Sequence, residues 1–415
     1  MMEITQLEAI ISDQLSVFQK KEQGFERHVN FQKFTVSNQI TVISGVRRSG
    51  KSTLLRQFSL KLHDFYYINF DDERLINFTV SDFNNLIILW KKKYNSKFIL
   101  IDEIQNIINW ERFVRRVHDE GYKLFITGSN AKLLSSELST HLTGRYQKLE
   151  LYPFSFKELL DYHKLSSSST LTSIMKTKIF KLFDDFILHG GFPEYIKYKD
   201  DEYLKRIYED IIYRDIITRF GIKEVKSFRE LANYIFTNFT KEASYNALKD
   251  ILGIKTSMSV RSYVGFLEES YLVFELFKYD FSLKKQYISD KKLYVIDNGI
   301  RNATAFYFSS DRGRLLENLV YIELKRRGVN LFYFKDKSEC DFLIQNKNTI
   351  TQAIQVTQRI DHSNEKREFE GILNSFERLK IKDGLILTEN QDETRIINSK
   401  KIIIRPIWKW LLDKE

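Results

Sequence analysis

The sequence predicts a multidomain α/β protein whose amino-terminal part is a parallel sheet covered by helices. From residue 39 onward, short apolar segments alternate with helical patterns, and this alternation is typical of parallel sheets. A length of 415 residues exceeds what one compact core usually accommodates, so two or three domains are expected. The expected strands are Ile40–Ile43, Phe65–Phe70, Phe98–Ile101, Leu124–Thr127 and Gln147–Leu151.

The composition is that of an ordinary globular protein, with 43% hydrophobic and 29% charged residues. The single cysteine, Cys340, cannot form an internal disulfide, which favours a reducing compartment. No segment approaches the roughly 18 uncharged apolar residues of a membrane-spanning helix, and no secretory signal is recognisable. We therefore expect a cytoplasmic protein without a membrane partner. A net charge of +10 permits contact with nucleic acid but does not require it.

The segment 45–53, GVRRSGKST, satisfies the pattern G-x-x-x-x-G-K-[ST] in full. A β-branched strand precedes it and a helical pattern follows, which is the context that a phosphate-binding loop requires. Its glycines let backbone N–H groups surround phosphate oxygens, Lys51 would bridge the β- and γ-phosphates, and the Ser52 hydroxyl would bind Mg²⁺. The residues expected to bind nucleotide are Gly45, Ser49, Gly50, Lys51, Ser52 and Thr53.

Two carboxylates follow the buried strand Phe98–Ile101. Asp102 would hold a water ligand of the Mg²⁺, and Glu103 would polarise the attacking water as general base. Acidic residues after an apolar strand are often only the solvated edge of a sheet. The phosphate-binding loop on the same chain favours the catalytic interpretation.

The segments GVRRSGKSTLL, FILIDEIQ and FITGSNAKLL together resemble the AAA-type branch of P-loop ATPases, which has an extra strand between its two Walker motifs. Phe65–Phe70 is expected to supply that strand. The resemblance implies ATP as the nucleotide. It also implies that Ser129, or else Asn130, senses the γ-phosphate, although both residues also suit a plain turn. Arg145 would act as an arginine finger in its own site or a neighbour's, with an ordinary surface arginine as the alternative.

The resemblance extends past this core. The turn HGGFPE, residues 189–194, resembles the helical lid of the same family, and residues 174–240 are expected to be mostly helical. The tail from residue 311 is expected to contain a helix, three strands and a helix. The segments GRLLENLV at 313–320, ECDFLI at 339–344 and AIQVT at 353–357, with KKLYVID at 291–297, resemble a C-terminal domain of unknown function that commonly follows this ATPase type. The expected domains are an AAA-type ATPase core at 1–155, a helical lid at 156–240, a winged helix at 241–292 and a nuclease-like α/β domain at 293–415.

The winged-helix expectation comes from a helix at Ser244, a turn at Gly253, a helix over Ser257–Ser270 and a strand from Val273. A DNA-reading second helix should be rich in basic and amide side chains, and here Arg261 is its only basic residue. We therefore favour internal packing or protein docking over DNA contact. The lysines that could still touch phosphates from a wing are Lys284, Lys285, Lys291 and Lys292.

The last domain resembles restriction-endonuclease-like folds, whose metal site uses a helix Glu, a strand Asp and an acidic-x-Lys strand. Glu317 and Asp341 match the first two positions. Gln355 and Thr357 stand where the second acid and the lysine belong, and neither can replace those groups chemically. The sequence therefore predicts an inactive, folded remnant of a nuclease.

The function expected from these observations is Mg²⁺-dependent ATP hydrolysis coupled to conformational switching or remodelling of a bound protein partner. One alternative is an ATP-dependent DNA-binding or DNA-processing protein. Another is a nucleotide-gated switch without turnover, against which Glu103 argues because a sensor needs no base. The sequence leaves the partner and any homo-oligomer open.

Overall fold

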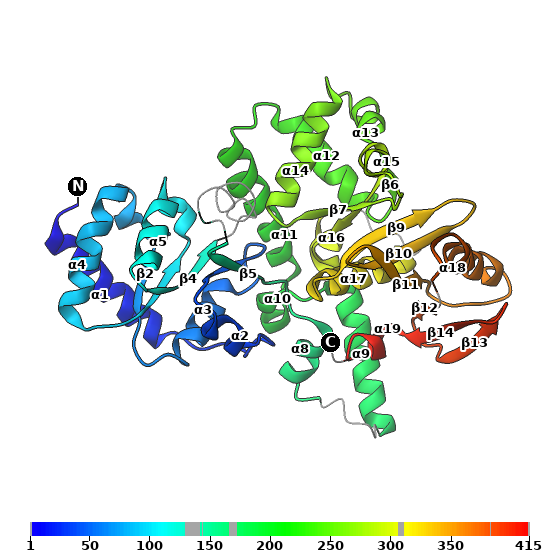
Figure 1. Cartoon of the computed structure of the whole chain (residues 1–415), viewed down its shortest axis with the longest axis horizontal. Coiled ribbons are helices and arrows are strands. Elements are labelled where there is room, and N and C mark those ends of the chain that lie inside the picture. The colour runs from blue at the N-terminus through cyan, green and yellow to red at the C-terminus, as the bar shows by residue number, and fades with distance from the viewer. Residues whose placement is uncertain are drawn as a thin grey trace. The chain divides into compact units, whose positions relative to one another are not determined.

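The computed structural model describes residues 2–128, 142, 144–165, 172–305, 311–381 and 383–413. The chain divides into two compact units, Met1–Leu151 and Tyr152–Glu415, which are described separately (Figure 1). Within the described ranges, no helix has both the length and the apolar character that crossing a bilayer requires.

The first unit is built on a five-stranded parallel sheet with the order β2-β3-β4-β1-β5. All five predicted strands are present, which confirms the predicted α/β class: β1 (Ile40–Ser44), β2 (Tyr66–Asn69), β3 (Phe98–Asp102), β4 (Lys123–Gly128) and β5 (Tyr146–Glu150). The strand between β1 and β3 in the sheet is β4. The expected strand at Phe65–Phe70 is present as β2, which lies between the loop at 45–53 and β3 in the chain and pairs with β3 at the edge of the sheet.

Helices on both faces bury this sheet, and the central strands β1 and β4 are buried along their whole length. The helices are α1 (Ile4–Lys20), α2 (Phe31–Val36), α3 (Lys51–Ser59), α4 (Phe83–Lys93) and α5 (Trp110–Asp119), with short 3-10 turns at Glu73–Leu75, Val80–Asp82 and Ile104–Asn106. Aromatic side chains fill much of the core. Phe18 of α1 stacks on Tyr67 of β2 at 3.8 Å between ring centroids.

The second unit begins with helices, as the sequence predicts: α8 (Phe156–Tyr162), α9 (Ser173–His189), α10 (Pro193–Tyr198), α11 (Asp201–Asp210), a π-helical segment Ile211–Thr218 and α12 (Val225–Thr237). A small antiparallel sheet of order β6-β8-β7 follows. In chain order, the three strands and the helices between them are β6 (Glu242–Ala243), α13 (Tyr245–Leu252), α14 (Ser257–Glu269), β7 (Val273–Phe277), α15 (Leu283–Ile288) and β8 (Lys291–Val295). The predicted helix, turn, helix and strand are thus present, and Gly253, at φ 63°, ends α13.

Two of the four lysines expected on a phosphate-contacting wing do not lie on the surface. Lys291 and Lys292 are buried in β8. The ammonium of Lys291 donates to the carbonyls of Tyr287 at 2.7 Å and Ser289 at 2.9 Å. That part of the basic-cluster expectation was wrong, because both side chains point inward from a strand that is buried on both faces.

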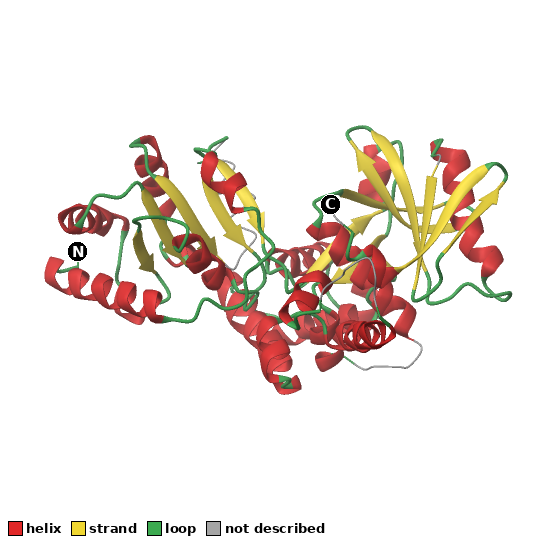
Figure 2. Ribbon diagram, turned by 90° about the horizontal axis from the view of Figure 1, so that it is seen from below, coloured by secondary structure: helices red, strands yellow, loops and turns green. Residues whose placement is uncertain are grey.

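The chain ends in a six-stranded mixed sheet of order β13-β14-β12-β11-β10-β9, drawn as twisted yellow strands in Figure 2. The elements are α16 (Asn298–Thr304), α17 (Arg312–Arg326), β9 (Asn330–Lys335), β10 (Glu339–Asn346), β11 (Thr349–Val356), α18 (Glu365–Leu379), β12 (Asp383–Thr388), β13 (Glu393–Ile397), β14 (Lys400–Pro406) and α19 (Ile407–Trp410). The predicted helix, three strands and helix correspond to α17 through α18. The sequence analysis missed β12, β13 and β14.

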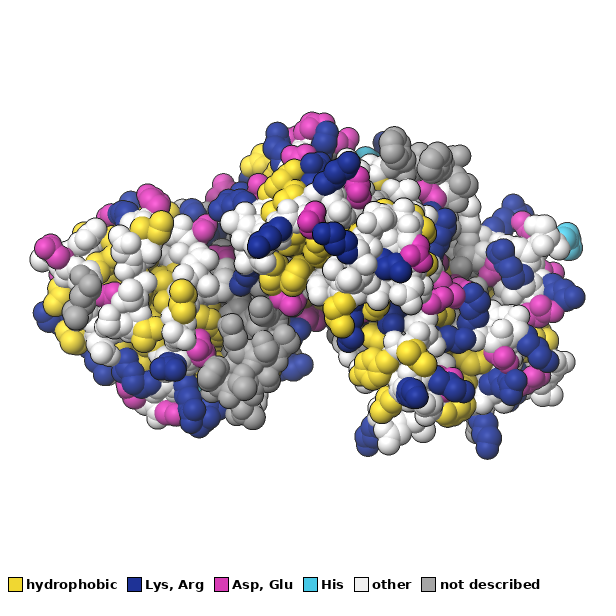
Figure 3. Space-filling model, turned by 90° about the horizontal axis from the view of Figure 1, so that it is seen from above, with side chains coloured by type: hydrophobic (Ala, Val, Ile, Leu, Met, Phe, Trp, Pro, Cys, Tyr) yellow, Lys and Arg dark blue, Asp and Glu magenta, His cyan; other side chains and the backbone are white. Residues whose placement is uncertain are grey.

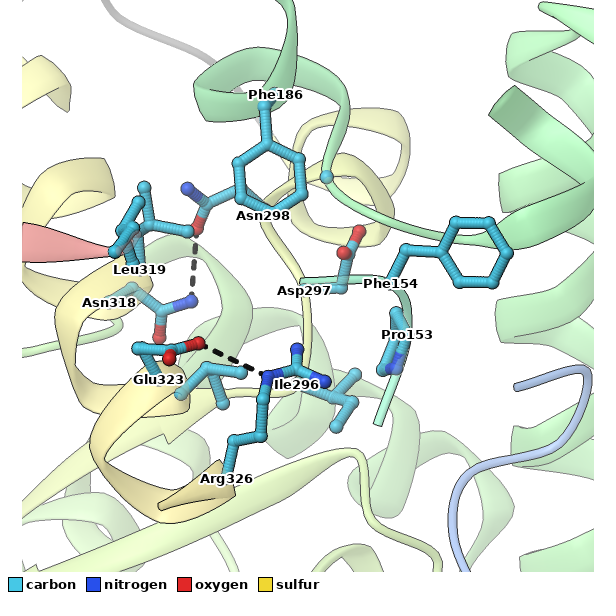
Figure 4. Close-up of a pocket in the computed structure, with 13 residues that line it drawn as sticks. Pro153, Phe154, Phe186, Ile296, Asp297, Asn298, Asn318, Leu319, Glu323 and Arg326 are labelled. Atoms are coloured by element: carbon cyan, nitrogen blue, oxygen red, sulfur yellow. Dashed lines mark hydrogen bonds and ion pairs between the residues drawn. The ribbon is translucent and has the colours of Figure 1, made fainter. Parts of the chain in front are cut away.

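A tight turn at Gly190–Gly191 is bonded to Asp297, the residue before α16, which is labelled in Figure 4. The Asp297 carboxylate accepts hydrogen bonds from the backbone N–H groups of Gly191 and Gly299, both at 2.8 Å. Burial raises the pKa of Asp297 to about 6, although these backbone hydrogen bonds act to lower it. A Cβ on Gly191 would lie 2.2 Å from the carbonyl oxygen of Phe154, so only glycine fits there.

We expect Gly191→Ala to lower the free energy of unfolding of this unit by about 1–3 kcal/mol, because the new methyl group meets backbone that cannot move aside. Urea denaturation followed by circular dichroism measures this. Gly265→Ala on α14 is the matched control, since no heavy atom of the described residues lies within 4 Å of its added Cβ. Equal denaturation midpoints for the two variants would contradict the close-packed turn.

Candidate nucleotide-binding site

The loop that joins β1 to α3 has the backbone of a phosphate-binding loop. Gly45 has φ 149° and Gly50 has φ 97°, both in the region that favours glycine. A Cβ on Gly45 would lie 2.1 Å from the carbonyl oxygen of Leu151. Arg48 also has a positive φ, 66°, which is strain of the kind that collects at functional sites. The two fixed glycines of the sequence pattern are therefore required by the backbone.

Lys51 and Ser49 present polar groups inside this loop. Lys51 is buried, and its ammonium donates to the carbonyl oxygens of Gly45 at 3.1 Å and Val46 at 3.0 Å. The Ser49 hydroxyl is fully buried and has no hydrogen-bond partner among the described residues. Such a group is costly unless a ligand completes it. Together with the amino end of the nine-residue α3, it fits an oxyanion such as a phosphate.

Parallel register brings the predicted acids to the same edge of the sheet as the loop. Asp102 is level with Asn69 of β2, Ile101 pairs with Ile126, and Ser44 pairs with Gly128. The last residues of β1, β3 and β4 therefore end side by side, and the loop starts at that edge.

Asp102 is buried and accepts hydrogen bonds from the hydroxyls of Thr127 and Ser52. The structure thus brings together the two residues that the sequence assigned to one metal ion. Burial raises the pKa of Asp102, while the two hydroxyls and the charge of Lys51 oppose that rise. A carboxylate whose pKa is raised in this way lacks full compensation of its charge.

Glu103 lies beside Asp102 in a left-handed backbone conformation, φ 51° and ψ 46°. Its backbone N–H donates to the Thr127 hydroxyl at 3.0 Å, and the side-chain amide of Gln105 donates to its carboxylate. Burial raises the pKa of Glu103, the nearby Lys51 charge lowers it, and Asp102 raises it further. A glutamate with a raised pKa is suited to accept a proton near neutral pH.

The hydroxyl of Ser52 and the carboxylate of Asp102 are hard oxygen donors that suit Mg²⁺. Across the described residues, no group of three or more His, Cys, Asp and Glu side chains is arranged to hold a metal. A Mg²⁺ ion here would therefore take its remaining ligands from water and from phosphate oxygens, which is its usual preference. The donor set fits the ion that the sequence implied.

The sequence analysis missed two residues that support the loop and the acids. The Thr127 hydroxyl donates to the Asp102 carboxylate and accepts from the Glu103 N–H. Its place as a polar residue at the end of an apolar strand is the sequence feature that could have identified it. Arg27 is buried and donates from Nη1 to the carbonyl oxygen of Ser49 at 2.9 Å. Its backbone N–H donates to the side chain of Gln57 on α3 at 3.2 Å. No sequence motif marks Arg27, because it precedes the sheet by thirteen residues or more.

Of the other two predicted catalytic residues, one is not described by the structure and the other lies away from this cluster. Ser129, like its alternative Asn130, lies outside the described residues. Arg145 precedes β5, and its carbonyl accepts from the N–H of Ile40 at 2.7 Å, at the amino end of β1. The length of β1, at about 3.3 Å per residue, separates it from the loop. Its guanidinium pairs with Asp119 at 3.2 Å, so the expectation that Arg145 serves its own site is corrected.

Comparison with known proteins agrees with this geometry. The family described as "AAA domain" matches residues 37–160, which contain the loop, Asp102, Glu103 and Thr127. Two families described as domains of unknown function match residues 180–311 and 312–410.

Two relatives match most of this chain. An uncharacterized protein of Methanocaldococcus jannaschii is 38% identical over 427 residues, covering 98% of this chain and 95% of the relative. An uncharacterized protein of Haemophilus influenzae is 31% identical over 338 residues, covering 77% of this chain and 82% of the relative.

Similar solved structures include Orc1 of Aeropyrum pernix in complex with DNA, with 12% identity and a TM-score of 0.31 over 72% of this chain and 90% of that one. Cdc6p of Pyrobaculum aerophilum has 14% identity and a TM-score of 0.26 over 75% of this chain and 92% of that one. These TM-scores are too low to inform the function of this chain.

We expect Thr127→Val to lower the free energy of unfolding of the first unit by about 1–3 kcal/mol, because it leaves the Asp102 carboxylate and the Glu103 N–H without their shared partner. Thr127→Ser keeps the hydroxyl and should unfold close to the wild type. Chemical denaturation of the full chain measures both variants. If Thr127→Val were as stable as Thr127→Ser, the hydroxyl bridge would not contribute to the free energy of unfolding.

Proposed function

We propose that this chain, which belongs to the same family as its Methanocaldococcus jannaschii and Haemophilus influenzae relatives, is a Mg²⁺-dependent ATPase. The match to the AAA domain supports nucleotide hydrolysis. The observation that carries the proposal is the buried cluster at the carboxyl edge of the sheet, where Asp102 accepts from Thr127 and Ser52 beside the loop that holds Lys51.

In the proposed cycle, the triphosphate enters the loop and takes over the Lys51 ammonium from the carbonyls of Gly45 and Val46. The loop amides and the Ser49 hydroxyl would bind phosphate oxygens, and Thr53 would extend this set at the first turn of α3. Mg²⁺ held by Ser52 and, through water, by Asp102 would neutralise charge on the β- and γ-phosphates.

Glu103 is proposed as the general base. It would accept a proton from the attacking water as the new oxygen bond to the γ-phosphorus forms and the bond to the β-γ bridging oxygen breaks, which releases ADP and phosphate. The Gln105 amide now holds the Glu103 carboxylate. Exchange of that amide for water would be the local step that prepares the base. Ser129 stays a proposed γ-phosphate sensor, and Arg145 would need a neighbouring copy to act as a finger.

The hydrolysis cycle is proposed to switch or remodel a bound protein. Exposed apolar side chains support a protein partner, because Phe281 is 82% exposed, Ile288 71% and Tyr287 66%, all in the segment between β7 and β8. As part of this proposal, the second unit contains a helical lid, a winged helix and a nuclease-like domain that respond to the hydrolysis cycle.

DNA binding is the weaker candidate. The same segment keeps only Lys284 and Lys285 exposed from the expected basic cluster. On the face drawn in Figure 3, Lys and Arg side chains are interspersed with Asp and Glu and form no continuous basic surface. A duplex-binding surface needs several cations in reach of consecutive phosphates.

We expect Glu103→Gln to slow ATP hydrolysis about 100-fold or more while ATP remains bound, because glutamine cannot accept the proton from water. Phosphate release and equilibrium ATP binding measure the two effects. Glu73→Gln, at an exposed glutamate of the same unit, is the control and should hydrolyse ATP at the wild-type rate. Hydrolysis by Glu103→Gln at the original rate would show that the base is another group.

Lys51→Ala serves as the counterpart to Glu103→Gln. It should weaken ATP binding itself, by about 10–100-fold, because the charge-assisted contacts to phosphate are lost. Lys92→Ala, at an exposed lysine on α4, should bind ATP normally. If Lys51→Ala and Lys92→Ala bound ATP equally well, the loop would not be the nucleotide site.

A further inference from the structure

A buried lysine occupies the carboxylate cluster of the second unit. The side chain of Lys292, on β8, is only 4% exposed. Its ammonium lies 3.1 Å from Glu317 of α17 and 2.6 Å and 3.0 Å from Glu339 and Asp341 of β10. One ammonium therefore has carboxylate oxygens from two neighbouring elements within hydrogen-bond distance.

The surrounding groups hold these carboxylates in place. The Tyr294 hydroxyl donates to Glu317 at 2.7 Å, and the backbone N–H of Val356 donates to Asp341 at 2.9 Å. Gln355 accepts from the Asp341 N–H at 3.2 Å and donates to Glu368 at 3.0 Å. The Gln355 amide, at the position of the expected second acid, is thus already hydrogen-bonded to Asp341 and Glu368.

We propose that Lys292 is a resident cation that takes the place of a divalent metal between Glu317 and Asp341, so that this unit performs no metal-dependent phosphodiester cleavage. The inference rests on the nuclease-like resemblance of Glu317 and Asp341 and goes beyond the ATPase proposal. A divalent ion would have to expel a buried ammonium that three carboxylates contact, or bind beside it against the repulsion of two like charges in a buried site.

The charges of the cluster agree with a permanently protonated lysine. Burial alone would lower the pKa of Lys292, but Glu317, Tyr294, Asp341 and Glu339 raise it well above its usual value. Burial also acts to raise the pKa of Glu339, and Lys292 overcomes this and lowers it. Burial raises the pKa of Glu317 to about 7, against the effect of Lys292.

The same contacts join two sheets. Lys292 belongs to the three-stranded sheet, whereas Glu339 and Asp341 belong to the six-stranded sheet. Two other hydrogen bonds link β9 of the six-stranded sheet to residues that flank β7 and β8: the Tyr279 N–H donates to the Tyr333 carbonyl at 2.8 Å, and the Tyr333 hydroxyl donates to the Asp290 carbonyl at 2.7 Å. Lys292 therefore acts as a structural tie in a place where a nuclease would bind its metal.

Mn²⁺ binding to the full chain, measured without nucleotide by electron paramagnetic resonance, tests the exclusion of metal. We expect wild type, Glu317→Gln and Asp341→Asn to bind the same amount of Mn²⁺. Ser52→Ala, which removes a proposed metal ligand of the first unit, is measured alongside to identify any ion bound there. An ion that the wild type binds and that Glu317→Gln or Asp341→Asn loses would overturn the proposal, and would leave the ATPase proposal untouched.

Thermal unfolding of Lys292→Met tests the role of the ammonium. Without it, the carboxylates lose their cation, and we expect the melting temperature of this unit to fall by about 10 °C at pH 7.5. Uncompensated buried carboxylates have folded-state pKa values above their unfolded ones. The loss should therefore shrink as the pH is lowered toward 5.5, where they bind protons in the folded state.

Lys335→Met is the matched control, because Lys335 is 46% exposed and pairs with Glu242 at 2.8 Å and Glu339 at 3.8 Å. It should melt close to the wild type at both pH values. Other titratable or charged groups that face the cluster are present in every variant: Tyr294, Tyr333, Glu242, Glu368, Cys340, Arg314 and Arg367. Wild-type stability of Lys292→Met at pH 7.5, or a loss that is independent of pH, would overturn the proposal. If this variant fails to fold, the Mn²⁺ measurement decides.

Discussion

The parallel register of β1, β3 and β4 is the constraint on which the candidate ATPase site depends. Because these strands run in the same direction and end level with one another, the loop after Ser44, the acid Asp102 and the hydroxyl of Thr127 meet at one edge. The Thr127 hydroxyl then links the side chain of Asp102 to the backbone of Glu103. Strand pairing thus brings residues that are distant in the sequence close together in space.

The two units use similar charged groups with opposite outcomes. In the first unit, Lys51 donates to the backbone carbonyls of Gly45 and Val46, Ser49 keeps a buried hydroxyl without a partner in the described structure, and burial leaves Asp102 with a raised pKa. We propose that a bound phosphate and a metal ion complete this cluster. In the second unit, Lys292 meets its carboxylates directly. The first arrangement is open to ligand, and the second is closed within the protein.

The two units are therefore proposed to have different roles. The candidate ATPase site lies within the match to the AAA domain, while the matches to domains of unknown function cover most of the second unit. If Lys292 replaces a metal, the second unit contributes shape and binding surface. The exposed apolar residues between β7 and β8, such as Phe281 and Ile288, offer such a surface. A partner bound there would sense the nucleotide cycle only through the coupling between units.

The sequence by itself determined the strands of the first sheet, the glycine loop at 45–53 and the place of Asp102 and Glu103 at the end of a strand, because each is encoded by residues that are close together in the chain. Strand periodicity, glycine positions and motif spacing are local properties. The tertiary structure decided which residues from distant segments meet: Arg27 with the loop, Thr127 with Asp102, Arg145 with Asp119 at the opposite edge, and Lys292 with Glu317. From the sequence alone, Lys292 was expected to be a surface charge. The pairing of β8 and the packing of α17 bury it, because burial and charge compensation depend on contacts that no single segment encodes.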